Sequence, residues 1–172
     1  AALWADDLCR PLLAIMTAEQ LAEATAPGKV ILFGEHAVVY GRPALAAPVT
    51  HLRARAVVAT DDGPDIRLIA ADLGRATTLS AARPDNPLAA TVRLVERHAG
   101  RPLPRGVTLT VASAIPIASG LGSGAAIAVA VIRALGILGQ LALTREDVSA
   151  LAYEIERLHH GTPSGIDNTV IA

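Results

Sequence analysis

Lys29 is the only lysine among the 15 lysine and arginine residues of the chain. It follows Pro27-Gly28 and precedes the apolar run Val30 to Phe33, which is an unusual place for a solvated charge. An ammonium group is a compact, mobile point charge suited to a phosphate oxygen or a neighbouring acid, whereas a guanidinium is a broad planar fork. The position therefore predicts that Lys29 meets a phosphate or a carboxylate. A leftover surface lysine is the alternative.

The segment Ile115 to Ala126 reads I-P-I-A-S-G-L-G-S-G-A-A and places glycines at three alternate positions, Gly120, Gly122 and Gly124. Glycines let backbone N–H groups converge on one anion, and the N-terminus of a helix starting near Ala125 adds partial positive charge. No Gly-Lys-Ser/Thr closes the segment, so it is not a Walker loop. It predicts a phosphate-binding loop. A turn made only for close helix packing explains the segment equally well when it is taken alone.

The segment Glu156 to Asn168 reads E-R-L-H-H-G-T-P-S-G-I-D-N. Glu156 and His160 are four residues apart and therefore share one face of a helix. We expect Glu156 to offer Mg²⁺ a carboxylate, and we expect Asp167, on the loop that follows, to meet Lys29. A surface ion pair for Glu156 and an ordinary turn for Asp167 are the alternatives.

The elements that must position these residues follow from hydrophobic periodicity, since alternation indicates strands and a 3.6-residue spacing indicates helices. The expected strands are Glu23–Phe33, His51–Thr60, Ile66–Ala71, Val107–Val111 and a last one that starts at Thr169. The expected helices are Asn86–Ala99, one that starts near Ala125 and one that Thr144 opens.

Local signals add detail to this outline. Asp62-Gly63-Pro64 predicts a hairpin between the second and third strands. Thr144, with Asp147 three residues later, resembles a capping box. The strands come first and then alternate with helices, which predicts an α+β fold in one domain. The buried stripe of the last helix should be Val148, Leu151, Ile155 and Leu158.

The composition excludes several classes of function. The chain of 172 residues fits one domain of ordinary size. Its aromatic content of 2% argues against a stacking platform for single-stranded nucleic acid, and its net charge of -1, without a basic cluster, argues against any nucleic-acid partner. The single cysteine, Cys9, excludes an internal disulfide and is typical of a reducing compartment, so a cytoplasmic location is expected.

Two segments imitate targeting or membrane signals. Residues 3–15 are moderately apolar but carry Asp6 and Asp7 where a signal peptide has positive charge. Residues 1–21 are therefore expected to be an extension outside the fold, and residues 22–172 to form the domain. The uncharged stretch Ala114 to Ile132 is interrupted by Pro116 and by glycines, so it predicts a buried helix and no membrane association.

Together, three stretches resemble the motifs of the GHMP kinase superfamily, and most closely those of its mevalonate kinases. They are A-P-G-K-V-I-L-F-G-E-H-A-V-V-Y-G-R-P-A at Ala26–Ala44, P-I-A-S-G-L-G-S-G-A-A at Pro116–Ala126 and H-G-T-P-S-G-I-D-N at His160–Asn168. Their order and spacing match from about residue 22 onward. The resemblance implies an N-terminal domain of ribosomal protein S5 domain 2-like fold, with a second, C-terminal domain missing from this chain. It therefore also implies no useful turnover by these 172 residues alone.

The resemblance also implies the reaction, which is ATP-dependent phosphorylation of the primary hydroxyl of mevalonate with Mg²⁺. Asp167 would take the hydroxyl proton and Lys29 would stabilise charge beside it. Glu156 and Ser123 would hold Mg²⁺. The nucleotide phosphates would be bound by Pro116, Ser119, Gly120, Leu121, Gly122, Ser123, Gly124 and Ala125. Mevalonate would be bound by Glu35, His36, Ser164 and Gly165.

One position departs from the pattern of the family. Gly124 stands where the family usually has a second serine that ligates Mg²⁺, so Ser123 or a water molecule would take that coordination position. Gly34-Glu35-His36 favours mevalonate over phosphomevalonate, whose kinases usually have Gly-Glu-Tyr there. Phosphomevalonate kinase and a non-catalytic nucleotide-binding module are the alternatives. Apolar surface left by a missing half would favour self-association, for example as a homodimer.

Overall fold

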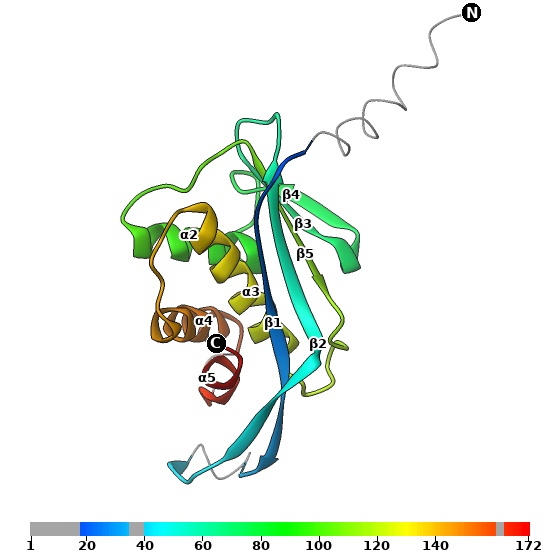
Figure 1. Ribbon diagram of the computed structural model, residues 1–172, viewed down its shortest axis with the longest axis vertical. Helices are drawn as coiled ribbons and strands as arrows, with labels where there is room; N and C mark the ends of the chain where they lie inside the picture. The colour runs from blue at the N-terminus through cyan, green and yellow to red at the C-terminus, as the bar shows by residue number, and fades with distance from the viewer. Residues whose placement is uncertain (1–17, 35–39, 161–163) are drawn as a thin grey trace, which may run out of the picture.

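The computed structural model describes residues 18–34, 40–160 and 164–172 (Figure 1). The strands are β1 (Gln20–Phe33), β2 (Leu45–Thr60), β3 (Ile66–Ala70), β4 (Arg75–Thr78) and β5 (Val107–Ser113). The helices are the short 3-10 turn η2 (Ala71–Leu73), α2 (Pro87–Ala99), α3 (Ser123–Leu138), α4 (Arg145–His160) and α5 (Ile166–Ile171).

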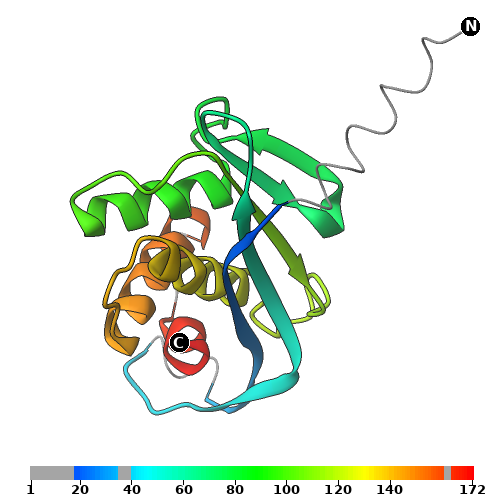
Figure 2. The same cartoon turned by 45° about the horizontal axis from the view of Figure 1, so that its top comes forward.

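The strands form one sheet in the order β1-β2-β5-β3-β4. All neighbouring pairs are antiparallel except β3 and β5, which are parallel. Figures 1 and 2 place the helices α2, α3, α4 and α5 on the same side of this sheet. The described residues therefore form a two-layer structure, and the α+β class predicted from the sequence is confirmed.

Helix α3 forms the centre of the core. It packs on β1, β2 and β5 on one side and on α2 and α4 on the other. A helix covered on both sides must be apolar nearly all round, and Val129, Ile132 and Leu135 are fully buried in it. The uncharged stretch before Arg133 is thus explained by burial in the protein. None of the helices in the described residues is long and apolar enough to cross a membrane.

Two predicted helix starts are confirmed, and the second of them was predicted from its capping signal. The Asn86 side chain accepts a hydrogen bond from the Ala89 N–H at 3.0 Å, immediately before α2. At the start of α4, the Thr144 hydroxyl accepts from the Asp147 N–H at 3.1 Å, while the Asp147 carboxylate accepts from the Thr144 N–H at 2.9 Å. Each bond satisfies a backbone donor that the first helical turn leaves free.

The predicted hairpin between residues 51–60 and 66–71 is wrong. The chain does turn at residues 62–65, but β2 and β3 both pair with β5, which lies between them. The Asp61 N–H donates to the Gly106 carbonyl, and the Gly106 N–H donates to the Asp65 carbonyl, so the turn is held open around the residues that lead into β5. Alternation identified both strands but does not encode which strand each one pairs with.

The predicted last strand at Thr169 is also wrong, because residues 166–171 form the helix α5. Gly165, at a φ of 75°, provides the turn into this helix, and the Thr169 hydroxyl donates to the Gly165 carbonyl at 2.7 Å. Burial of Ile166 and Ile171 against the rest of the domain outweighs the strand preference of the β-branched run.

Three further details differ from the prediction: the exposure of one residue in α4, the presence of β4, and the first residue of β1. Leu158 was expected in the buried stripe of α4 but is 65% exposed, whereas Val148, Leu151 and Ile155 are buried. β4 was not predicted, since four residues give too short a pattern. β1 begins at Gln20, so its first two residues belong to the segment that was expected to lie outside the fold.

Candidate functional site

Lys29 and Asp167 form a close ion pair. The ammonium nitrogen of Lys29 in β1 lies 2.9 Å from Oδ1 of Asp167 in α5, and the two side chains are 7% and 24% exposed. The prediction that the lone lysine meets this acid is confirmed, although Asp167 lies in the first turn of a helix and not in a loop. A charge-assisted contact of this kind is strong when it is shielded from water.

An irregularity in the sheet presents Lys29 to the site. Pro27 pairs with Arg53, but Gly28 pairs with Val49, so residues 50–52 of β2 bulge out between the two pairs. Lys29 then faces Pro48, which has no N–H to offer. Such bulges redirect the side chains that follow them.

The backbone of β1 also touches the segment that we call the glycine loop, residues 115–122. The Lys29 N–H donates to the Leu121 carbonyl at 2.9 Å. A Cβ at Gly28 would lie only 3.1 Å from the same carbonyl oxygen, so the strand and the loop approach as closely as they do because residue 28 is glycine.

The glycine loop ends on the ion pair at Gly122. This residue has a φ of +71°, and a Cβ there would lie 3.1 Å from Cε of Lys29, from Oδ2 of Asp167 and from Cδ1 of Ile171. Gly122 is also the N-cap of α3, whose first residue is Ser123. The free N–H groups of the first turn of α3 thus begin beside the only ammonium side chain of the protein, which favours binding of an anion there.

Within the loop, Ser119 has a structural contact. Its hydroxyl donates to the Pro116 carbonyl at 2.7 Å and accepts from the Leu121 N–H at 3.4 Å. Ala118 has a φ of 57° and Gly120 a φ of 74°, so together with Gly122 the loop turns through three left-handed residues. Gly124 has open space around its Cα, where a Cβ would meet nothing within 4 Å.

Glu156 in α4 is the third charged group of the site. Burial and, to a lesser extent, the charge of Asp167 raise the pKa of Glu156, the charge of Lys29 opposes the rise, and the resulting pKa is about 7. A carboxyl group in this state is poorly solvated as an anion and gains from a cation. Glu156 and the Ser123 hydroxyl both supply oxygen ligands of the kind that Mg²⁺ prefers, so the residues present fit this metal.

The remaining predicted substrate residues are only partly described. Ser164 is exposed, and its hydroxyl accepts from the Ile166 N–H at 3.4 Å at the start of α5. Gly165 directly precedes Ile166 as the N-cap of this helix. Glu35 and His36, and the side chain of His160, lie outside the described residues.

A hollow of 1140 Å³ adjoins the glycine loop. Its walls come from β3, η2 and β4, from the first residues of α2, from the start of the glycine loop at residues 115–117, and from Ser123 at the start of α3. Because Ser123 follows Gly122, the hollow reaches to within one residue of the Lys29–Asp167 pair. Sequence reasoning missed the walls formed by η2, β4 and α2, since they carry no motif and β4 was not recognised as a strand.

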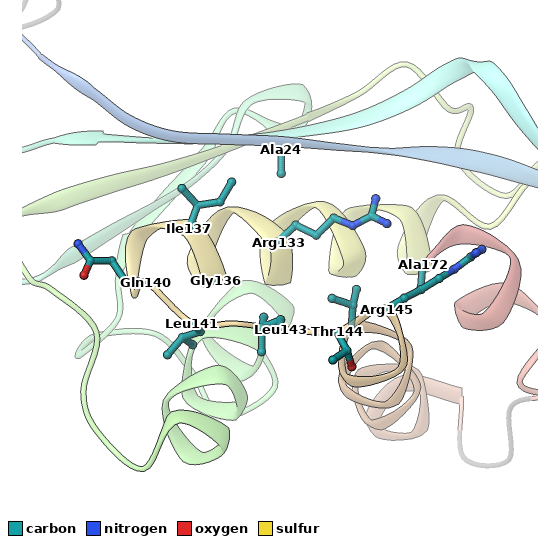
Figure 3. A pocket seen from close by; sticks show the side chains of 11 residues that line it. Ala24, Arg133, Gly136, Ile137, Gln140, Leu141, Leu143, Thr144, Arg145 and Ala172 are labelled. Carbon is teal, nitrogen blue, oxygen red and sulfur yellow. The ribbon is translucent and has the colours of Figure 1, made fainter.

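A second cavity, of 650 Å³, lies elsewhere between α3, the start of α4 and β1 (Figure 3). Arg133 points into it and donates to the Thr25 carbonyl at 3.2 Å. Burial lowers the pKa of Arg133, and the charge of Arg145 lowers it further. None of the predicted site residues lines this cavity, so it is not part of the site around Lys29.

Comparisons with known proteins agree with this geometry. The family description "GHMP kinases N terminal domain" matches residues 86–172. The mevalonate kinase of Thermococcus sibiricus is 40% identical over an aligned length of 164 residues, and the alignment covers 87% of this chain and 48% of that protein. The chain thus spans about half the length of the curated relatives it matches.

Solved structures give the same result for the fold. The crystal structure of the Methanococcus jannaschii mevalonate kinase matches with a TM-score of 0.80 and 28% identity, over 87% of this chain and 50% of that one. The Streptococcus pneumoniae phosphomevalonate kinase, solved with phosphomevalonate and AMPPNP, matches with a TM-score of 0.68 and 22% identity, over 86% of this chain and 45% of that one. The latter likeness is one of fold alone.

Proposed function

The chain belongs to the GHMP kinases, and from this premise we propose that it contributes to an ATP-dependent kinase that phosphorylates the primary hydroxyl of mevalonate. One observation supports this most directly. The Lys29–Asp167 pair lies against Gly122, at the point where the glycine loop passes into α3. A phosphate at this helix start and a hydroxyl at the carboxylate would be neighbours.

The roles of the residues follow from their chemistry. Asp167 accepts the proton of the acceptor hydroxyl, and Lys29 stabilises the charge on the transferring group. The first N–H groups of α3 and those of the glycine loop hold the phosphates. The hollow beside the loop takes the rest of the nucleotide. Phosphoryl transfer needs little covalent help from a protein, so positioning and charge stabilisation are sufficient.

Glu156 and Ser123 would hold Mg²⁺ in this proposal, and the bound ion would neutralise charge on the nucleotide phosphates. Gly124 supplies no ligand, so Ser123 or water would occupy the position of the usual second serine. The acceptor would be bound near Asp167 by Glu35, His36, Ser164 and Gly165.

Two alternative functions can be compared with this proposal. Phosphomevalonate kinase shares the fold, but its likeness to this chain is lower in identity than that of the mevalonate kinases. A nucleotide-binding module without activity would not need an acid paired with a buried lysine beside the phosphate loop. We propose the cytoplasm as the location, since the single cysteine is typical of a reducing compartment.

The test uses the full-length product of the gene that encodes this chain, mixed with MgATP and either mevalonate or phosphomevalonate while ADP release is followed. We expect ADP release that depends on mevalonate, and a loss of roughly 10²-fold or more in the Asp167→Asn variant, with nucleotide affinity nearly unchanged. Release with phosphomevalonate alone would favour the first alternative. Nucleotide binding without release would favour the second.

A further inference from the structure

Asn168 is a buried polar residue next to the proposed base. Only 6% of it is exposed. Its side-chain amide nitrogen donates to the backbone carbonyl of Ser149 at 3.1 Å and to the Ser149 hydroxyl at 2.9 Å. Both acceptors belong to one residue of α4, so a single side chain of α5 is tied to α4 twice.

This tie connects the three charged groups of the site. Ser149 and Glu156 are seven residues apart on α4, about two helical turns, and therefore lie on the same face. Asp167 and Asn168 are consecutive on α5, so their side chains leave the helix about 100° apart. One of them reaches Lys29 on β1 while the other reaches Ser149 on α4.

The remaining contacts of α5 do not fix its rotation as well. Six residues form too few internal hydrogen bonds to hold a helix in place without tertiary contacts. Ile166 and Ile171 supply apolar contacts, which are not directional. Hydrogen bonds to two acceptors on one residue are directional and resist rotation about the helix axis.

The side chain of Asn168 also has an unfavourable feature that an apolar side chain at this position would avoid. Among the described residues, its carbonyl oxygen Oδ1 is buried without a hydrogen-bond partner. An unpaired buried carbonyl is unfavourable, whereas leucine of similar shape would fill the same space without it. The amide nitrogen is therefore the part of the side chain that has a use here.

From these contacts we infer that Asn168 is a positioning residue for the phosphoryl transfer, which locks the rotation of α5 against α4 and so aims Asp167 at Lys29. The inference rests on the proposed function for its effect on turnover. Its structural content, the dependence of the Lys29–Asp167 pair on Asn168, does not.

The variants are chosen in matched pairs in the full-length protein. Asn168→Leu removes the amide and keeps the shape, while Leu151→Ala removes a buried apolar side chain of α4 and tests loss of stability alone. Ser149→Ala removes one of the two acceptors and Ser149→Thr keeps it.

We expect kcat to fall at least roughly 10-fold in Asn168→Leu, with KM for ATP within about 2-fold, because a misplaced base affects the transition state and not nucleotide binding. Ser149→Ala should show a smaller loss. Ser149→Thr should keep kcat, as should Leu151→Ala in its folded fraction.

A second measurement does not depend on activity. The side-chain ammonium resonance of Lys29 is followed by NMR and assigned by its absence in Lys29→Arg. We expect it to shift away from its ion-paired position in Asn168→Leu and Ser149→Ala but not in Leu151→Ala. Unchanged kcat and an unchanged Lys29 resonance in Asn168→Leu would refute the inference. Should that variant fail to fold, the same two results in Ser149→Ala refute it. A shifted resonance in a protein without mevalonate-dependent turnover would remove the proposed function and leave the positioning role standing.

Discussion

The backbone N–H of Lys29 donates to the carbonyl of Leu121 at 2.9 Å. The residue that brings the ammonium group to Asp167 is therefore bonded, through its backbone, to the loop that we propose holds the phosphates. If the loop moves, either this hydrogen bond must break or Lys29 must move with the loop. The geometry of the ion pair and that of the loop are consequently one arrangement and should respond together to mutation.

Lys29→Arg should lower kcat by roughly 10²-fold although it keeps the charge. Lys29 is 6% exposed and Gly122 lies against its side chain, so the larger guanidinium cannot take the same place beside Asp167. Steady-state kinetics with saturating MgATP provide the measurement. Arg97→Lys, at an exposed position of α2, is the control and should be silent. Normal turnover in Lys29→Arg would show that a positive charge alone is enough.

Gly122→Ala should lower kcat by at least about 10-fold, because the new Cβ pushes on Lys29 and Asp167 by a few tenths of an ångström in an alignment that tolerates little error. The left-handed backbone at this residue adds a strain of about 1–2 kcal/mol for any side chain. Kinetics and thermal unfolding of the same variant separate the two effects. A variant that loses stability but keeps kcat would contradict the proposed proximity.

Gly124→Ser is the matched substitution two residues later, in the first turn of α3, and should be tolerated. A Cβ at Gly124 meets nothing within 4 Å and the residue has no left-handed φ. The added hydroxyl should leave kcat unchanged or lower the Mg²⁺ concentration needed for half-maximal rate, which a Mg²⁺ titration measures. A collapse of nucleotide binding would mean that the loop requires the backbone freedom of glycine here.

The pKa of Glu156 predicts a pH dependence of stability in the absence of Mg²⁺. Because folding raises this pKa from 4.5 to about 7, the folded state binds the proton more tightly, so the contribution is fully present below about pH 4.5 and is lost as the pH rises through about 7. We expect the free energy of unfolding to fall by about 1–2 kcal/mol over this window, a value reduced for partial exposure. Denaturant unfolding at several pH values measures it, and Glu156→Gln should remove the slope. An equal slope in both proteins would refute this assignment.

Ala118→Gly should stabilise the protein by about 0.5–1 kcal/mol, because alanine pays for its left-handed backbone while glycine does not. Gln140→Gly, at the other non-glycine residue with positive φ within the described ranges, is the matched control outside the site and should give a similar gain. Thermal unfolding compares them. Only Ala118→Gly should also change nucleotide affinity, since only this residue lies in the glycine loop. Equal nucleotide affinities in the wild type and both variants would show that the backbone conformation at Ala118 does not affect nucleotide binding.

The contact between Lys29 and Asp167 was easier to predict from the sequence than the pairing of the strands. An isolated lysine beside Pro27-Gly28 and an acid in a Gly/Pro-rich segment predicted the pair of Lys29 and Asp167, because charges near apolar runs must find partners. Strand pairing was not predictable, since alternation is the same whether β2 neighbours β3 or β5. The residues from Thr169 onward read as a strand because propensity is local, while the burial of Ile166 and Ile171 that favours a helix there is tertiary. Asn168 and the bulge at residues 50–52 left no signal in periodicity at all.

The place of β5 in the sheet has a consequence for how the protein is made. Among the strands of the described residues, β5 comes last in sequence but occupies the middle of the sheet, between β2 and β3. During synthesis, β1 to β4 emerge first and can form only the two pairs β1–β2 and β3–β4. Until residue 113 leaves the ribosome, one edge of β2 and one edge of β3 have no partner, and unpaired edges invite association between chains. Joining the two halves through β5 requires contacts distant in sequence, which form slowly. The nascent chain therefore passes through an interval in which the exposed edges of β2 and β3 can pair with other chains. Chaperones, or fast translation of α2 and β5, would limit such association.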